Sequence, residues 1–447
     1  MLKYSKYNHI VKLPGEDAYI LANFRTGAIV RLTPLQKAMF DRATELPGTA
    51  KPIREFLRGG FLVGYDEMRH MKTQAFQATG MGGSISLTIC PTLACNFACP
   101  YCFESARPGH MNEETQDALV KFAEDEISRF ALKDVHVTWF GGEPLLFSAI
   151  IESLSERIIE ICKKHGASYH AGIITNGWFL TEENARLLER AKVKTMQITL
   201  DGPTPETNDG TRREKNGGSS FARIMENLYN LRPYAKEEGT EEKNFPIVSI
   251  RCNVHKGNAP LFGELKEKIA AIAKETGVNI DAYPSIMDTY DKTPRKMRDD
   301  ALSMEQYAGI LDTDAMSHRA GLSVYRRIYC MAQRLHAYVI DERGDMYKCW
   351  EDVGRSEMAF GNVGSFSLLR EPDARINVED RYFETVFPED DKECMECKVF
   401  PFCVGGCPHK RITGGRKCIP EKMDLDSCVL ARWREKQEKA ARGQEKK

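Results

Sequence analysis

The cysteines of this chain are the residues whose number and spacing point first to chemistry. Fourteen occur among 447 residues, three of them within residues 95–102 and four within residues 394–407. A chain of this length is not a small disulfide scaffold, and a reducing compartment would keep its thiols free. Clustered free thiols are typical of metal sites. We expect Cys90, Cys162 and Cys252, which lie in or near strand and helix patterns, to be buried thiols instead.

The first cluster has the spacing CxxxCxxC and consists of Cys95, Cys99 and Cys102, just after a strand-like run. Three thiolates cannot complete a four-iron cubane, so one iron would be left for another ligand. A zinc site or a chance triple are the alternatives, and the position between a strand and a helix disfavours both.

Polar residues and glycines follow the next strand-like runs. One run ends in GGEP at residues 141–144, where two glycines would let the backbone approach a ligand and the carboxylate could accept from an ammonium group. Later strand ends carry Thr175, Asn176, Asp201, Arg212, Arg213, Arg251 and Asn253. Asp201 could instead cap the following helix.

A second cysteine pattern occupies the C-terminal part of the chain. Its members in order are Cys330, Gly344, Cys349, Cys394, Cys397, Cys403, Cys407 and Cys428, with CxxC at 394–397. A pair of structural zinc ribbons is the alternative to iron–sulfur clusters here, because CxxC also suits zinc.

Length and composition fit a globular protein of two to four domains. The formal net charge of −1, with 42% hydrophobic residues, argues against general affinity for nucleic acid or acidic membranes. No apolar run approaches a membrane span, and the first residues lack the apolar centre of a signal peptide. We therefore expect a cytoplasmic protein.

The elements that must position these residues alternate between residues 84 and 310. The strand-like runs cover 84–90, 134–140, 171–177, 194–202, 247–254 and 279–286, with helical patterns between them. Six βα repeats predict a parallel sheet with helices outside, either open or a partial (β/α)6 barrel. Reactive groups gather at the C-terminal ends of such strands.

The other segments differ in character. Residues 1–78 hold three strand-like runs and then a helix with Thr33 as N-cap and Pro34 at its first position. Residues 311–430 are rich in cysteine and glycine, and we expect an irregular domain that depends on bound metal. Residues 431–447 form a charged tail that we expect to fray into solvent.

The loop CPTLACNFACPYCFE resembles the cluster loop of the radical S-adenosylmethionine (SAM) superfamily. The resemblance implies a partial barrel and a 4Fe-4S cluster whose open iron chelates SAM. An electron then cleaves SAM to methionine and a 5′-deoxyadenosyl radical. The SAM contacts that it implies are Tyr101 beside the adenine, Gly141, Gly142 and Glu143 at the amino group, and Thr175, Asn176 and Arg212 at the ribose and carboxylate.

The C-terminal pattern resembles the seven-cysteine SPASM domain, which binds two auxiliary 4Fe-4S clusters, so three clusters are implied in all. By resemblance the outer cluster is held by Cys394, Cys397, Cys403 and Cys428, and the inner cluster by Cys330, Cys349 and Cys407. Eleven cysteines would complete all three clusters, and the motifs supply ten. Some family members have a further cysteine where this chain has Val324. The inner cluster could thus be completed by Cys418, or by a substrate cysteine that becomes the partner in a thioether bond.

SPASM relatives mostly modify peptides or proteins. Residues 1–78 resemble a winged-helix peptide-recognition element, although an extension that covers the barrel is the alternative. Sulfatase maturases carry an aspartate after the cysteine that matches Cys349, whereas this chain has Trp350, followed by Glu351 and Asp352 as candidate bases.

We therefore expect a maturase that crosslinks a ribosomally made precursor peptide through a thioether or C–C bond. It would draw electrons from a flavodoxin- or ferredoxin-type donor. The alternatives are an anaerobic sulfatase-maturing enzyme and, from another class, a non-catalytic iron–sulfur redox sensor.

Overall fold

The computed structural model describes residues 2–48, 50–80, 82–234, 247–311, 325–365 and 376–445. These residues fold into two compact units. Unit 1 contains Met1–Met81, Ser303–Arg334 and Tyr382–Lys447, and unit 2 contains Gly82–Leu302 and Leu335–Arg381. Over the described ranges, no helix combines the length and apolar character needed to cross a membrane.

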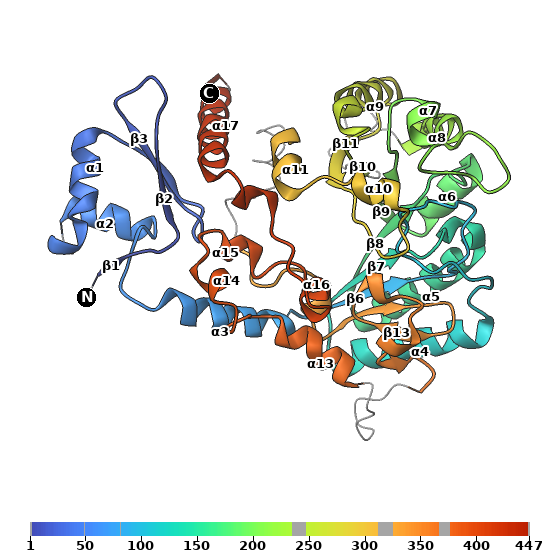
Figure 1. The fold of residues 1–447 in the computed structure, drawn as a ribbon. Coiled ribbons are helices and arrows are strands. Elements are labelled where there is room, and N and C mark those ends of the chain that lie inside the picture. Colours follow the sequence, from blue (N-terminus) through green and yellow to red (C-terminus); the bar gives the residue numbers. More distant parts are fainter. Residues whose placement is uncertain are drawn as a thin grey trace. The chain divides into compact units, whose positions relative to one another are not determined.

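A large mixed sheet forms the centre of unit 2 (Figure 1), with strand order β11-β10-β9-β8-β7-β6-β12-β13-β14 over the described residues. The strands are β6 (Ser84–Ile89), β7 (Asp134–Trp139), β8 (Ser168–Thr175), β9 (Val193–Thr199), β10 (Ile247–Val254) and β11 (Ile280–Ile286). Each of these pairs in parallel with the next along the chain. The strand-like runs in this part of the sequence are thereby confirmed. The order never reverses, unlike that of a doubly wound sheet, and is consistent with a partial barrel.

Helices between the strands cover the sheet of unit 2 (Figure 1). They are α4 (Glu113–Arg129), α5 (Ser148–His165), α6 (Glu182–Arg190), α7 (Pro205–Asn208), α8 (Ser220–Leu228), α9 (Phe262–Thr276) and α10 (Arg295–Asp299). Short 3-10 turns are η2 (Pro144–Phe147), η3 (Tyr229–Tyr234), η4 (Ala259–Leu261), η6 (Trp350–Asp352) and η7 (Ser356–Met358). Helix α5 buries Ile151, Leu154 and Ile158 at helical spacing and packs against β8. Asn112 and Thr181 cap α4 and α6 with their side chains.

Three further strands come from the segment that was expected to be irregular. Strand β12 (Ala337–Ile340) pairs in parallel with β6, and β13 (Asp345–Tyr347) and β14 (Gly361–Asn362) continue the sheet antiparallel. The expectation is wrong for these residues because runs of two to four residues give little periodic signal. Pairing decides their conformation: β12 pairs with β6, β13 with β12 and β14 with β13.

The N-terminal part of unit 1 contains an antiparallel sheet of β2 (Asn8–Lys12), β3 (Tyr19–Asn23) and β4 (Ile29–Leu32), and a second ladder of β1 (Lys3–Tyr4) with β5 (Leu62–Val63). The helices are α1 (Pro34–Asp41), α2 (Lys51–Arg58) and α3 (Glu67–Gly80), with the turn η1 (Ala43–Glu45). Thr33 caps α1 in a reciprocal capping box with Gln36, and Pro34 opens the helix, as predicted. Leu21, Phe40 and Phe56 are among the residues of the shared core.

The remaining elements among the described residues of unit 1 are helices and 3-10 turns. They are α11 (Met304–Ile310), η5 (Met331–Gln333), α14 (Lys392–Glu396), α15 (Phe400–Cys403), α16 (Pro408–Ile412), η8 (Pro420–Lys422) and α17 (Leu425–Glu445), while α13 (Ile376–Glu384) crosses the boundary between the units.

The charged C-terminal stretch was expected to fray and instead continues α17. Arg432 donates to the carbonyl of Gly27 (3.1 Å), and Lys436 donates to that of Ile29 (2.9 Å). Helix α17 packs against β2 and β3. The expectation is wrong because long basic side chains reach backbone carbonyls that a composition argument does not see.

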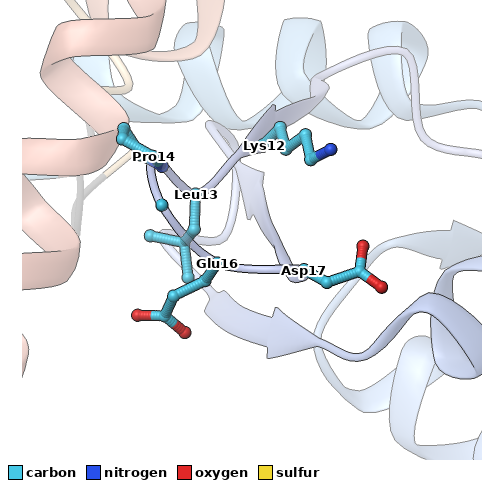
Figure 2. A pocket seen from close by; sticks show the side chains of 6 residues that line it. Lys12, Leu13, Pro14, Glu16 and Asp17 are labelled. Carbon is cyan, nitrogen blue, oxygen red and sulfur yellow. The ribbon is translucent and has the colours of Figure 1, made fainter.

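A surface hollow of about 570 Å³ lies at the turn between β2 and β3 (Figure 2). All of its lining residues belong to the single stretch from Lys12 to Asp17. Figure 2 shows the carboxylates of Glu16 and Asp17 pointing away from each other. The hollow therefore lacks the convergent polar groups of a binding site.

Candidate active site

The loop between β6 and α4 carries Cys95, Cys99 and Cys102. Residues 213–215 hold this loop in place. The amide of Ala98 donates to the carbonyl of Arg213 (2.8 Å), and the ammonium group of Lys215 donates to the carbonyl of Cys95 (2.7 Å). The cluster loop is thus fixed by backbone contacts to a segment more than a hundred residues away in sequence.

The two glycines of GGEP pack against the cluster loop. A Cβ on Gly141 would lie 2.3 Å from the carbonyl oxygen of Thr92, and one on Gly142 would lie 2.3 Å from that of Ala94. The amide of Glu143 donates to the same carbonyl of Ala94 (2.9 Å). The contacts that require glycine here are made with the protein's own backbone, rather than with a ligand as the motif alone suggested.

Glu143 links the end of β7 to the end of β8. Its fully buried carboxylate accepts from the amide of Leu145 (3.0 Å), the hydroxyl of Thr175 (2.7 Å) and the amide of Asn176 (2.7 Å). Burial raises the pKa of this carboxyl, and the three hydrogen bonds act in the opposite direction. A carboxylate has about four acceptor positions, so one stays available to an ammonium group.

Asn176 faces the cluster loop. Its side-chain amide donates to the side-chain oxygen of Asn96 (2.8 Å) and lies 3.8 Å from the sulfur of Cys95. Burial raises the pKa of the Cys95 thiol to about 12. A bound metal is what would stabilise a thiolate in such a position, because metal ligation deprotonates thiols.

A buried polar network lies at the ends of β9 and β10. The hydroxyl of Tyr101 donates to Asp201 (2.5 Å) and accepts from Arg212 (2.9 Å). Asn253 donates its amide to Asp201 (3.1 Å) and accepts from Arg251 (2.9 Å). Asp201 therefore joins several strand ends, and the idea that it caps the next helix is wrong, since a threonine three residues later caps α7.

Arg212 is the unusual member of this network. It is 6% exposed and lies over the ring of Phe97 at 5.4 Å, and its Nε has no hydrogen-bond partner among the described residues. Its guanidinium lowers the pKa of the Cys99 thiol, against the larger opposing effect of burial. A buried cation with a spare donor beside a cysteine fits an anionic group at this loop, such as a thiolate-bound cluster or a carboxylate.

An aromatic layer follows the cluster loop. Trp350 stacks on Phe140 at 4.9 Å, and Phe140 stacks on Phe103 at 6.4 Å. The indole Nε1 of Trp350 donates to Thr88 (3.0 Å), and Tyr290 lies 6.0 Å from Phe103. The residue directly after Cys349 is thus held against the barrel strands by packing and one hydrogen bond.

The two candidate bases differ in their surroundings. Glu351 accepts a hydrogen bond from Tyr290, whose pKa is raised by burial and by this carboxylate. Asp352 is fully buried. The structure therefore favours Glu351 as the accessible carboxylate of the pair.

Two residues of this region were not predicted from the sequence. Tyr290 and Lys292 follow β11, and the ammonium group of Lys292 donates to the carbonyls of Phe103 (2.8 Å) and Glu104 (2.6 Å). The rule that polar groups gather at strand ends could have found them, because they follow the last strand of the repeat.

The cysteines of the C-terminal pattern are divided between the two units. Cys349 follows β13 in unit 2, and unit 1 contains Cys330, Cys394, Cys397, Cys403, Cys407, Cys418 and Cys428. Burial raises the pKa of Tyr329, and Cys407, Cys403 and Cys330 add to this effect, so these cysteines lie near its phenol. Val324 lies outside the described residues. Cys90, Cys162 and Cys252 are buried, as predicted.

Comparisons with known proteins agree with this geometry. The family model of the radical SAM superfamily matches residues 89–241. The mycofactocin maturase MftC of Mycolicibacterium smegmatis is 27% identical over 346 residues, which cover 73% of this chain and 79% of that protein. The serine-type anaerobic sulfatase-maturating enzyme of Bacteroides thetaiotaomicron is 25% identical over 353 residues, covering 71% and 81%. SuiB of Streptococcus suis, solved with its precursor peptide SuiA, matches with a TM-score of 0.51 and 14% identity over 96% of this chain and 100% of that chain.

The cluster loop, the parallel sheet and the family match define a radical SAM enzyme. Within that class, the chain is related to the SPASM-type maturases. A SAM-binding 4Fe-4S cluster is implied by this family, and relatives of the SPASM type carry auxiliary clusters. Because the chain is an enzyme, the redox-sensor alternative is wrong.

Proposed function

We propose that this enzyme crosslinks a ribosomally made precursor peptide. The main support for the proposal is the N-terminal module formed by β2–β4 and α1–α3, which precedes the strands of unit 2 in the sequence. A fold likeness that includes this region extends to SuiB, solved with a precursor peptide, over 96% of the chain. The same kind of comparison with the solved structure of anSMEcpe, which has a TM-score of 0.56, covers 78% of the chain. Residues 1–78 are proposed to bind the leader part of the peptide.

Trp350 also supports peptide crosslinking over formylglycine formation. The residue after Cys349 is an aromatic side chain packed on Phe140, and no carboxylate occupies that position. The second candidate, oxidation of a cysteine or serine to formylglycine, is favoured by the 25% identity to the sulfatase-maturating enzyme. It would require Glu351 to replace the aspartate that the sulfatase maturases carry one position earlier.

The chain's residues fit the implied cofactors. Cys95, Cys99 and Cys102 would hold the SAM-binding cluster, with Glu143, Asn176 and Arg212 around SAM. When bound, these groups would supply a 5′-deoxyadenosyl radical, and the auxiliary clusters an electron acceptor. Three clusters in all, and a flavodoxin- or ferredoxin-type donor, are part of the proposal.

The protein's own part is to bind, orient and exclude water. The Trp350–Phe140 stack forms an apolar wall beside the cluster loop, which would shield a carbon radical from solvent. Forming a thioether from a C–H and an S–H group removes two hydrogens: one would leave as a hydrogen atom to the 5′-deoxyadenosyl radical, and the other as a proton together with one electron for the auxiliary clusters. Glu351, oriented by Tyr290, is proposed to accept the proton from the substrate thiol.

The test uses the anaerobically reconstituted enzyme, SAM, a reductant and the candidate precursor peptide encoded beside it. The expected result is release of 5′-deoxyadenosine and a peptide that has lost two hydrogen atoms and resists labelling by an aldehyde reagent. A product that does react with the aldehyde reagent would establish formylglycine formation instead. An unchanged peptide in a sample that cleaves SAM would contradict the choice of substrate.

A further inference from the structure

The cysteines that follow α13 can be assigned from their surroundings in unit 1. Cys394 lies in α14, and its amide donates to the side chain of Asp391 (3.1 Å). The amide of Cys397 donates to the carbonyl of Cys394 (3.1 Å), and Cys403 ends α15. These three cysteines form one connected group, and the resemblance to the motif gives Cys428 as their fourth partner.

The chain before Cys418 returns to this group. Gly406 has a φ of +79°, and a Cβ at this position would lie 2.5 Å from the carbonyl oxygen of Lys417 and 4.0 Å from the sulfur of Cys403. Residue 417 is therefore held against the backbone beside that sulfur, which brings the next residue, Cys418, to the same place. A side chain at Gly406 would prevent this approach.

Electrostatic effects connect the same four thiols. Cys394, Cys397 and Cys418 are all close enough to Cys403 to interact with it electrostatically. The four sulfurs therefore share one neighbourhood within unit 1.

Basic side chains surround this neighbourhood. Arg411 donates to the sulfur of Cys394 (2.9 Å) and also pairs with Asp391 (3.1 Å). The ammonium group of Lys422 lies 3.8 Å from the sulfur of Cys418 and donates to Glu393 (2.6 Å). Hydrogen-bond donors directed at the thiolate sulfurs are usual around iron–sulfur sites, because they stabilise the negative charge of the ligands.

Cys428 has different surroundings. It lies in the first turn of α17 and is 2% exposed. The charged groups near its sulfur are the carboxylates of Glu421 and Asp424. Two carboxylates disfavour a further negative charge at this place, so these surroundings suit a buried thiol better than a ligand of an anionic cluster.

We infer that Cys418, and not Cys428, is the fourth ligand of the site formed by Cys394, Cys397 and Cys403. This assignment replaces the one drawn from the motif, and it rests on the proposal that the segment holds an auxiliary cluster. It also removes Cys418 from the candidates for the inner cluster that the resemblance implies.

The test compares Cys418→Ala with Cys428→Ala in a full-length background in which Cys95, Cys99 and Cys102 are all replaced by alanine. That background removes the SAM-binding cluster, so iron and acid-labile sulfide report on the auxiliary clusters alone. The background should retain about eight irons per chain. Cys418→Ala should retain about four, and Cys428→Ala should match the background.

Three further results separate the possible failures. A background without iron would contradict the auxiliary-cluster proposal itself. Loss of iron from Cys428→Ala with retention in Cys418→Ala, or equal behaviour of the two variants, would overturn the ligand assignment.

Cys418→Ser tests the same assignment in a variant that we expect to fold even if Cys418→Ala does not. Its oxygen can still bind iron, so it should keep the iron content and change the EPR spectrum of the reduced protein, while Cys428→Ser should leave the spectrum unchanged. Cys162→Ala, which removes a buried thiol from α5, is the matched control for folding. An unchanged spectrum for Cys418→Ser would also overturn the assignment.

Discussion

Replacing Gly142 with alanine tests whether the glycines of GGEP are required for close packing against the cluster loop. The new Cβ would lie 2.3 Å from the carbonyl oxygen of Ala94 and 2.6 Å from that of Leu93. Ordinary contacts are more than about 1 Å longer, so the loop must move. Overpacking of this kind costs about 1–3 kcal/mol. Displacing the loop also weakens the hydrogen bond from Glu143 to Ala94, which contributes about 1 kcal/mol.

We therefore expect Gly142→Ala to destabilise unit 2 by roughly 2–4 kcal/mol and to reduce the iron held by the SAM-binding loop. The measurements are the midpoint of anaerobic thermal unfolding and the iron content after reconstitution. Gly263→Ala is the matched control, because that glycine lies inside α9 with open space around its Cβ position. Alanine should stabilise that helix by about 0.5–1 kcal/mol. If Gly142→Ala unfolds like the unmodified protein and binds equal iron, the packing argument for GGEP is wrong.

Tyr101→Phe removes a hydrogen-bond partner from the buried Arg212. We expect it to lower the free energy of unfolding by about 1–3 kcal/mol and to weaken SAM binding. The measurements are the unfolding midpoint and calorimetric titration with SAM. Glu143→Gln places a donor NH2 group opposite the backbone amide of Asn176 or the other donors to this carboxylate. We expect a loss of stability and of SAM affinity of similar size, measured in the same way. Wild-type stability would contradict the role given to this carboxylate. Burial lowers the pKa of His255, so the unfolded state binds its proton first and stability rises with pH around the ordinary histidine pKa. His255→Gln should therefore flatten the dependence of the unfolding midpoint on pH between about 5 and 7, and an unaltered slope would exclude this histidine as its source.

Local sequence patterns were sufficient for the elements that carry the site. The strands β6–β11 are β-branched runs of strand length, and their ends carry Glu143, Asn176 and Asp201. Period and turn residues specify such elements because they act over a few neighbouring positions. The cap of α1 by Thr33 was readable for the same reason.

The roles of particular side chains depended on contacts between distant parts of the chain. The local sequence is compatible with Asp201 as a helix cap, whereas in the structure its carboxylate accepts a hydrogen bond from Tyr101, a hundred positions earlier. The choice between Cys418 and Cys428 is of the same kind, because it depends on the return of residue 417 to Gly406 and on Lys422 beside the sulfur of Cys418.

The sequence by itself therefore determined the class of chemistry, because CxxxCxxC and GGEP place thiols and glycines at the ends of the first two strands of the repeat. The tertiary structure decided what those glycines contact, which carboxylate is accessible and which thiols are neighbours. These choices depend on long-range packing and burial, and residue spacing along the chain does not encode either.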